Sequence, residues 1–216
     1  IAERGECGDG GLDQRRLRQL REQFLYERAL LERTDGGDLL GLCQENLVFR
    51  CDLFEGIGEK LLCPFHYFGV PDEVDYAQIP WRSSAFDETE LTKALATQSR
   101  AQNALEQFRK HGGTKAIGFC CSIVHADFMT AFFKERGVRA AAIHSGESSA
   151  PRVTALEQLQ AGALDIVFAV DILNEGVDLP NVDSILMLRP TESAIIWLQQ
   201  FGRGLRLSEN KPRLTV

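Results

Sequence analysis

The stretch AIGFCCSIVHADFMTAFFKERGVRAAAIHSG, residues 116–146, decides the fold. Its first six residues, AIGFCC (116–121), form an uninterrupted apolar run, which predicts a buried strand. A helical pattern follows over 123–137 and closes on Gly137, and a further strand is predicted over 139–146. A strand, a helix and a second strand in this order are typical of a parallel β-α-β unit.

The same alternation continues through the rest of the sequence. The further elements that the pattern predicts are helices over 150–162 and 193–206 and strands over 165–170, 184–189 and 213–216. We therefore expect an α/β protein with a parallel sheet that is covered by helices on both faces. In such a sheet we expect functional residues to gather beyond the carboxyl ends of the strands.

The first half of the sequence predicts a mainly helical region. Its predicted parts are a disordered start (1–11), a helix (12–33), a turn (34–38), a less regular apolar segment (39–59), a strand (61–70), a loop (71–81) and one helix (86–111). Asp87 and Glu90 predict a capping box at the start of the last helix. The acidic run DETE (87–90) is therefore interpreted as a helix cap, because no apolar strand precedes it. GIGEK (56–60) lacks the spacing of a phosphate-binding P-loop.

Composition narrows the class of protein. The 216 residues are 44% apolar and 25% charged, which is ordinary for a soluble globular protein. No apolar run is long enough for a membrane span and no signal peptide is visible, so we expect a cytoplasmic location, and we expect the sequence to be part of a longer protein. The six cysteines form no C-x-x-C pair, which indicates reduced thiols and no metal site. The net charge of −7 argues against a basic nucleic-acid-coating protein but leaves room for a local phosphate-contacting groove.

The segment WLQQFGRGLR (197–206) concentrates candidate functional residues. Arg203 and Arg206 would project from one face of a helix, and the fork of a guanidinium group matches phosphate geometry. Gly202 and Gly204 are expected to allow close packing of the segment. The alternative is that the two arginines make structural salt bridges.

Two other segments carry candidate phosphate contacts. Ser122 and His125 lie where a predicted strand meets the next helix, and a helix N-terminus suits a nucleic-acid phosphate. The alternative is a Ser N-cap with a structural histidine. Arg152, after His144-Ser145-Gly146, is a further phosphate contact or a solvated arginine.

The loop DILNEGVDLP (171–180) follows the predicted strand that ends at Val170. Gly176 permits close approach, and Asp178 is a candidate acceptor. The alternative is an ordinary loop with an Asx cap and a proline stop.

Along the chain, the order FCCSIVHA (119–126), HSG (144–146) with Arg152, AVDILNEGVDLP (169–180) and QQFGRGLR (199–206) resembles motifs IV, V and VI of the second RecA-like lobe of superfamily 2 helicases. The phrases VDILNEGVDLPNVDSILMLRPTES and LQQFGRGLRLSENKP most resemble bacterial DEAD/DEAH-box helicases related to restriction-enzyme translocase subunits. The resemblance implies three regions: a partly disordered N-terminal helical remnant (1–38), a mainly helical connector between lobes (39–113) and a RecA-like helicase C-terminal domain (114–216). The chain departs from the family at RALLER (28–33), where only Ala29, Glu32 and Arg33 fit motif III, and at Val170, where many members have Thr.

The resemblance also implies a mechanism. ATP with Mg²⁺ would lie between two lobes, held mainly by a P-loop and acidic box on a first lobe that this sequence lacks, so the chain alone is expected not to hydrolyse ATP. The implied site residues are Arg203 and Arg206 as arginine fingers, Gln199 as a positioning residue, Gly176, Asp178 and Gly202 around the nucleotide, and Ser122, His125 and Arg152 along a DNA or RNA track. The partners would be nucleic acid and the first lobe, with no membrane. The alternatives are a non-catalytic nucleic-acid-binding or docking module and a translocase that moves on duplex without unwinding it.

Overall fold

The computed structural model describes residues 52–82, 85–170, 181–190 and 194–216. Several predictions lie outside the described residues: the disordered start, the helix over 12–33, the turn over 34–38, the motif III comparison at Ala29, Glu32 and Arg33, and the loop with Gly176 and Asp178.

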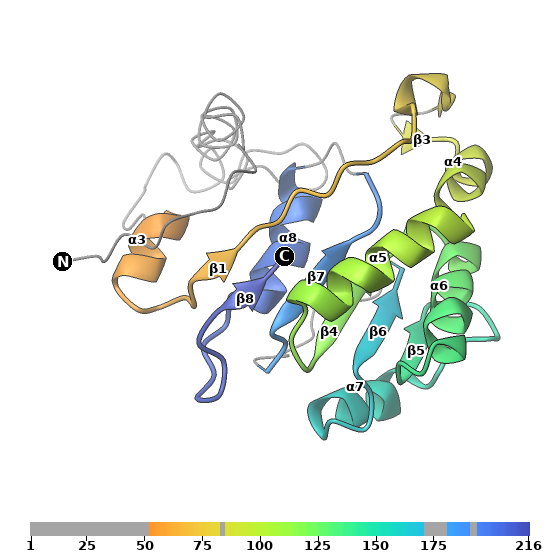
Figure 1. The fold of residues 1–216 in the computed structure, drawn as a ribbon. Helices are drawn as coiled ribbons and strands as arrows, with labels where there is room; N and C mark the ends of the chain where they lie inside the picture. Colours follow the sequence, from red (N-terminus) through yellow and green to blue (C-terminus); the bar gives the residue numbers. More distant parts are fainter. Residues whose placement is uncertain (1–51, 83–84, 171–180, 191–193) are drawn as a thin grey trace, which may run out of the picture. The chain divides into compact units, whose positions relative to one another are not determined.

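The described part of the chain is built around a six-stranded sheet in the order β1-β8-β7-β4-β6-β5 (Figure 1). Its strands are β1 (Phe65–His66), β4 (Ala116–Phe119), β5 (Ala140–Ile143), β6 (Ile166–Ala169), β7 (Ser184–Met187) and β8 (Leu214–Thr215). Every pairing in this sheet is parallel, which confirms the predicted α/β fold with a RecA-like parallel sheet. Apart from β1, each strand begins at the predicted residue or one residue later and ends one to three residues before the predicted end.

The central strand β4 shows why this sequence forms a buried parallel sheet. All four of its residues are buried, and β4 pairs with β6 on one side and β7 on the other. Side chains that alternate along a strand point to opposite faces, so a strand that is apolar throughout needs cover on both faces. Gly118 provides space for a neighbour, because a Cβ atom there would lie 2.6 Å from the ring of Phe168.

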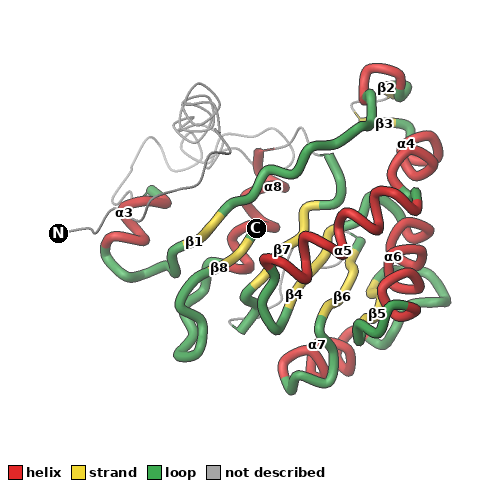
Figure 2. The backbone as a smooth tube through the Cα atoms, in the orientation of Figure 1, coloured by secondary structure: helices red, strands yellow, loops and turns green. Residues whose placement is uncertain are grey.

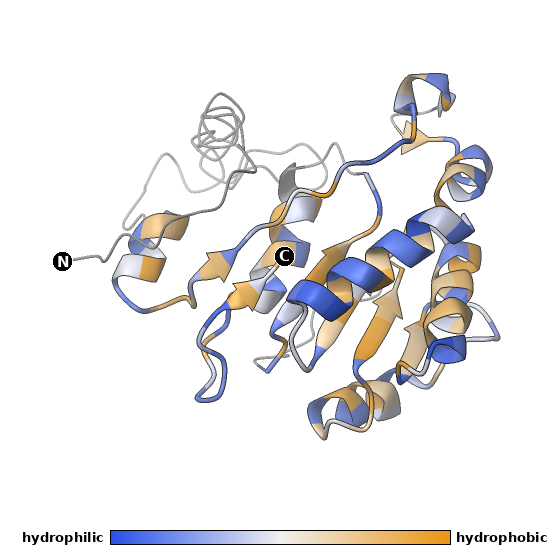
Figure 3. Ribbon diagram, viewed as in Figure 1, coloured by the Kyte–Doolittle hydropathy of each residue, from blue (hydrophilic) through white to orange (hydrophobic). Residues whose placement is uncertain are grey.

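Helices cover both faces of the sheet, as predicted. The helices α5 (Gln98–His111) and α6 (Ile123–Glu135) pack on one face, and their buried residues include Leu105 and Phe133. The helices α7 (Arg152–Gln160) and α8 (Ala194–Gly204) pack on the other face, with Leu159 and Phe201 in a second cluster. Figure 2 shows the strands between these helices, and Figure 3 shows apolar strands beside a largely hydrophilic α5.

The ends of two helices confirm the turn chemistry of the sequence. Gly137 follows α6 with a φ of 80°, and Gly162 follows α7 with a φ of 74°. These positive φ values favour glycine, because a Cβ atom is strained in the left-handed region. The chain can therefore turn back toward the sheet directly after each helix.

The single helix predicted over 86–111 is wrong. The structure has two helices there, α4 (Glu88–Leu95) and α5, because the side chain of Thr97 accepts a hydrogen bond from Arg100 N and starts a new helix. Asp87 caps α4 as predicted and accepts from Glu90 N at 3.1 Å. The capping box is incomplete, because Asp87 N donates to the Pro80 carbonyl instead.

The region predicted as a connector contributes directly to the sheet. Of the strand predicted over 61–70, only β1 forms, and it pairs with β8 at the sheet edge. The remaining elements of this region are α3 (Leu53–Gly58), a 3-10 turn η1 (Tyr76–Gln78), and the strands β2 (Trp81–Arg82) and β3 (Ala85–Phe86) of a separate hairpin. GIGEK lies at the end of α3, where a P-loop would instead precede a helix. The boundaries at 38/39 and 113/114 stay predictions.

Candidate functional site

The arginines of the WLQQFGRGLR segment lie at the carboxyl end of α8. Arg203 is in the last turn of the helix and half-buried, and the helix ends at Gly204. Arg206 lies two residues past this end and is exposed. The prediction that both arginines project from one helix face is therefore wrong, because Arg206 belongs to the loop that follows. The two guanidinium groups nevertheless come from positions only three residues apart.

Aromatic packing anchors this end of α8 to the sheet. Phe201 is fully buried, stacks on Trp197 with ring centroids 4.8 Å apart, and receives the edge of Phe65 at 4.8 Å. Gly204 packs against the strands, since a Cβ atom there would lie 2.4 Å from Leu214. The backbone that carries the arginines is thus fixed from both sides.

Gly202 does not have the packing role that the sequence predicted. A Cβ atom added at Gly202 would meet nothing within 4 Å, whereas one added at Gly204 would overlap Leu214 and Ile185. Close packing therefore requires only the second glycine of the GRG sequence. The open space beside Gly202 is compatible with the predicted approach of a ligand.

The two adjacent glutamines of α8 lie in different surroundings. Gln199 is half-buried and sits one helical turn before Arg203. Gln200 is 1% exposed, and its side-chain amide makes no hydrogen bond with any residue that the structure describes. The sequence distinguished Gln199 by its spacing to Arg203 and Arg206, but it did not indicate that Gln200 is buried.

The arginines lie at the opposite ends of the β-strands from Ser122 and Arg152. Helix α8 follows β7 and runs back, so Gly204 reaches Ile185 near the start of β7 and Leu214 at the start of β8. Arg203 and Arg206 are therefore near the amino ends of the strands. Of the candidate residues, these two arginines do not lie at the carboxyl ends of the strands. Ser122, three residues after the end of β4, does.

The start of α6 is a capped and buried helix end. Ser122 caps α6 and accepts from His125 N at 3.1 Å, and Thr92 on α4 donates to the Ser122 hydroxyl at 2.7 Å. Ser122 and His125 are 3% and 2% exposed. His125 Nδ1 accepts from Cys121 N at 3.4 Å, which leaves the proton of the neutral ring on Nε2. This arrangement matches the structural alternative, and contact with a phosphate stays a prediction.

Burial and, to a smaller extent, the positive charge of Arg100 together lower the pKa of His125 to about 4. The unfolded chain binds a proton below about pH 6.5, whereas the folded chain does not until about pH 4, so stability is lost as the pH falls between these values. We expect the free energy of unfolding to drop by about 3 kcal/mol across this window from His125 alone. Urea unfolding of wild type and His125→Gln between pH 7 and pH 4 measures this contribution.

The His125→Gln variant should lose most of this pH dependence, because glutamine does not titrate and its side-chain carbonyl can still accept a hydrogen bond. The matched variant His66→Gln removes an exposed histidine and provides the comparison. Equal pH slopes for wild type and His125→Gln would contradict the buried neutral histidine.

Sequence reasoning missed a hydrogen-bonded group beside the start of α6. The His144 side chain is fully buried, and its Nδ1 accepts from Gly146 N at 3.1 Å. Its Nε2 therefore donates to Asp127 Oδ1 at 3.0 Å, and Ser148 donates to the other carboxylate oxygen at 2.7 Å. Burial alone would raise the pKa of Asp127, but the hydrogen bonds from Ser148 and His144 lower it below its usual value. The one available signal was Asp127, the single carboxylate in the first turn and a half of α6.

Arg152 lies at the carboxyl ends of the strands, as Ser122 does, but on the other face of the sheet. It is the first residue of α7, it is exposed, and α7 lies with α8 on the face opposite α6. Of the predicted site residues, the structure thus joins Ser122 to His125 and places Gln199, Gly202 and Arg203 together on α8. Gly176 and Asp178 lie outside the described residues.

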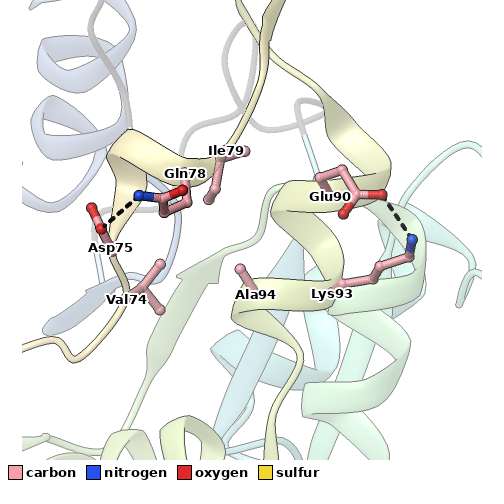
Figure 4. A pocket seen from close by; sticks show the side chains of 7 residues that line it. All are labelled: Val74, Asp75, Gln78, Ile79, Glu90, Lys93 and Ala94. Atoms are coloured by element: carbon pink, nitrogen blue, oxygen red, sulfur yellow. Dashed lines mark hydrogen bonds and ion pairs between the residues drawn. The ribbon is translucent and has the colours of Figure 1, made fainter.

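Two surface hollows lie away from the arginines. One of about 480 Å³ lies between η1 and α4, where the Asp75–Gln78 and Glu90–Lys93 pairs each form within their own segment (Figure 4). The other, of about 570 Å³, lies between α5 and the extended segment 67–73. Neither Arg203 nor Arg206 lines either hollow.

Two negative findings concern only the described part of the chain. No group of three or more His, Cys, Asp or Glu side chains there is arranged to hold a metal ion. No helix within the described ranges combines the length and the apolar character that crossing a membrane requires.

A parallel sheet with helices on both faces, and two arginines at the end of an anchored helix, defines an α/β lobe of the RecA-like class. Residues 99–208 match the family model described as the helicase conserved C-terminal domain. This match covers half of the chain, and the chain belongs to this family.

The relatives with which the chain was compared share about a quarter of their residues with it over the aligned regions. The "Putative ATP-dependent helicase IRC3" of Saccharomyces cerevisiae is 26% identical over 187 residues, which cover 85% of this chain and 27% of IRC3. The UvrABC system protein B of Kosmotoga olearia is 28% identical over 117 residues, or 51% of this chain and 18% of that protein. The Hef helicase domain of Pyrococcus furiosus has 24% identity and a TM-score of 0.41, covering 56% of this chain and 25% of that structure. The chain therefore spans about a quarter or less of each of these proteins.

Proposed function

We propose that this chain is the second lobe of an ATP-dependent nucleic-acid helicase or translocase of superfamily 2, of the type related to restriction-enzyme translocase subunits. The observation that carries the proposal is the placement of Arg203 and Arg206 within four residues of each other at the fixed end of α8. Membership of the helicase C-terminal domain family supports it, because a helicase lobe of this kind requires cationic groups that face a nucleotide.

The donor set at the end of α8 fits a polyphosphate. Each guanidinium group offers several N–H donors in a planar fork, which suits phosphate oxygens. ATP with Mg²⁺, held mainly by a first lobe, supplies the phosphoryl group that is transferred. Arg203 and Arg206 stabilise the charge that develops on that group, and Gln199 orients the helix face beside them. Gly202, with Gly176 and Asp178, lines the nucleotide cleft.

The end of the sheet where the strands have their carboxyl ends is the proposed nucleic-acid side of the lobe. The side chains of Ser122 and His125 are buried, so they contribute by shaping and orienting the first turn of α6 rather than by direct contact. The backbone N–H groups of that turn other than that of His125, which Ser122 caps, and the exposed Arg152 are the groups that would meet the phosphates of DNA or RNA. Nucleotide and nucleic acid would then lie at opposite ends of the β-strands of one sheet. Hydrolysis at the amino ends of the strands could therefore move the nucleic acid at their carboxyl ends.

The chain alone should not hydrolyse ATP, because its sequence contains no G-x-x-x-x-G-K-[ST] motif. We expect a phosphate-release assay to show no ATP hydrolysis by the 216-residue chain, with or without nucleic acid, and nucleic-acid-stimulated hydrolysis by the complete protein. Hydrolysis by the purified chain that survives in an Arg203→Ala preparation would indicate a contaminant. Hydrolysis that Arg203→Ala removes would contradict the division of labour between two lobes.

The same complete protein distinguishes the alternatives. Absence of nucleotide hydrolysis together with retained nucleic-acid binding would favour the non-catalytic docking module. Hydrolysis with triplex displacement but without strand separation would favour a duplex translocase. Strand separation would establish the helicase.

A further inference from the structure

A buried lysine and a buried cysteine meet at the carboxyl end of α8. Lys211 is 5% exposed, and its Nζ donates to the Gly204 carbonyl at 3.0 Å. The Cys63 thiol donates to the same carbonyl at 3.4 Å, and Cys63 N donates to the Leu205 carbonyl at 2.8 Å. Two residues that are 148 positions apart in the sequence thus bind one end of the helix that carries Arg203.

The chemistry of a helix end explains these contacts. The last four carbonyl groups of a helix lack intrahelical partners and carry the negative end of the helix dipole. A lysine ammonium group is a suitable partner for them, and a buried one needs such a partner. Burial lowers the pKa of Lys211, while Cys63 and Asp183 act in the opposite direction. A buried cation therefore binds the last residue of α8, although burying its charge costs free energy.

The geometry fixes the loop that carries the second arginine. The bond from Lys211 Nζ to the Gly204 carbonyl closes a ring of chain that contains Arg206, and Lys211 N donates to the Ser208 carbonyl at 3.1 Å inside it. Leu205, the residue before Arg206, is 4% exposed. Arg203 directly precedes Gly204. Both arginines thus extend from backbone that these contacts hold in place.

We propose that Lys211, assisted by Cys63, is a positioning residue that sets the direction in which Arg203 and Arg206 extend toward the nucleotide. Cys63 lies two residues before β1, so the contacts of Cys63 and Lys211 with Gly204 also link the edge strand of the sheet to the segment that carries the arginines. The inference rests on the proposed function, because it assigns Lys211 an effect through those two residues. Lys211 itself does not touch the nucleotide.

The test is a double-mutant cycle on ATP hydrolysis by the complete protein, measured in the steady state. We expect Lys211→Met to lower kcat about 10- to 100-fold, with the KM for ATP changed less than twofold, because a displacement of about 1 Å can cost this much in rate. In a background that lacks both arginines (Arg203→Ala with Arg206→Ala) the same substitution should have no more than a twofold effect. A loss of folded protein would instead lower the rate by the same factor in both backgrounds.

Lys115→Met is the matched control, because Lys115 Nζ donates at 2.6 Å to the carbonyl of Gln160, the last residue of α7. It removes the same kind of contact at a helix without the arginines and should leave kcat within twofold of wild type. An unchanged kcat in Lys211→Met, or an equal loss in both backgrounds, would overturn the inference. Normal hydrolysis by Arg206→Ala and Arg203→Ala would instead overturn the proposed function.

Discussion

We expect the Arg203→Ala variant of the complete protein to hydrolyse ATP about 10³- to 10⁵-fold more slowly than wild type. The reason is that a guanidinium group at a transferring phosphoryl group stabilises charge that is present only in the transition state. Arg203 is half-buried on the last turn of a helix fixed by Phe201 and Gly204, so the backbone that carries it is held in place. Steady-state hydrolysis with saturating nucleic acid measures the loss.

The variant must remain folded for this result to be informative. Circular dichroism of Arg203→Ala should match wild type, because the substitution removes no residue of the two apolar clusters. Arg109→Ala is the matched control, since Arg109 is an exposed arginine on α5 that donates to the Arg136 carbonyl. Hydrolysis by Arg203→Ala within threefold of wild type would contradict the arginine-finger assignment.

The second large effect is on stability. We expect Phe201→Ala to lower the free energy of unfolding of the chain by about 3–5 kcal/mol. Phe201 is fully buried between Trp197 and Phe65, so its removal leaves a cavity between α8 and the sheet. Since single domains are stable by about 5–15 kcal/mol, this change removes a large part of the total. Urea unfolding followed by circular dichroism measures it.

A milder substitution keeps this prediction testable if the Phe201→Ala variant does not fold. Phe201→Leu keeps most of the apolar volume and should cost clearly less than Phe201→Ala. Leu207→Ala is the control, because Leu207 is 51% exposed and lies just beyond the same helix. A cost below about 1 kcal/mol for Phe201→Ala would show that aromatic packing does not anchor α8.

The parallel sheet could be predicted because apolar pattern and turn chemistry are local properties of the sequence. Strands such as β4 and β6 are apolar on both faces, and Gly137 and Gly162 mark helix ends with positive φ. The predicted helix over 86–111 failed for an equally local reason. The Thr97 hydroxyl competes for the Arg100 backbone N–H, and this polar contact outweighs the continuity of the helical pattern.

The candidate site was predicted less completely. The spacing of Gln199, Gly202, Arg203 and Arg206 indicated the arginine segment, because it resembles motif VI of superfamily 2 helicases. No spacing rule could indicate Lys211 or Cys63, which reach Gly204 from separate parts of the chain. The Asp127–His144 pair was missed for the same reason, since it joins α6 to the loop after β5.

The sequence by itself determined the class of fold and the residues that carry positive charge, since both depend on periodicity and residue type along short stretches. Only the tertiary structure decided at which ends of the β-strands those charges lie. Helix α8 runs antiparallel to the strands, so Arg203 and Arg206 lie near the amino ends of the strands, while Ser122 and Arg152 lie near their carboxyl ends. Burial was likewise a tertiary outcome: Ser122 and His125 are enclosed because α4 and α5 pack over the start of α6, a contact between segments that no local pattern encodes.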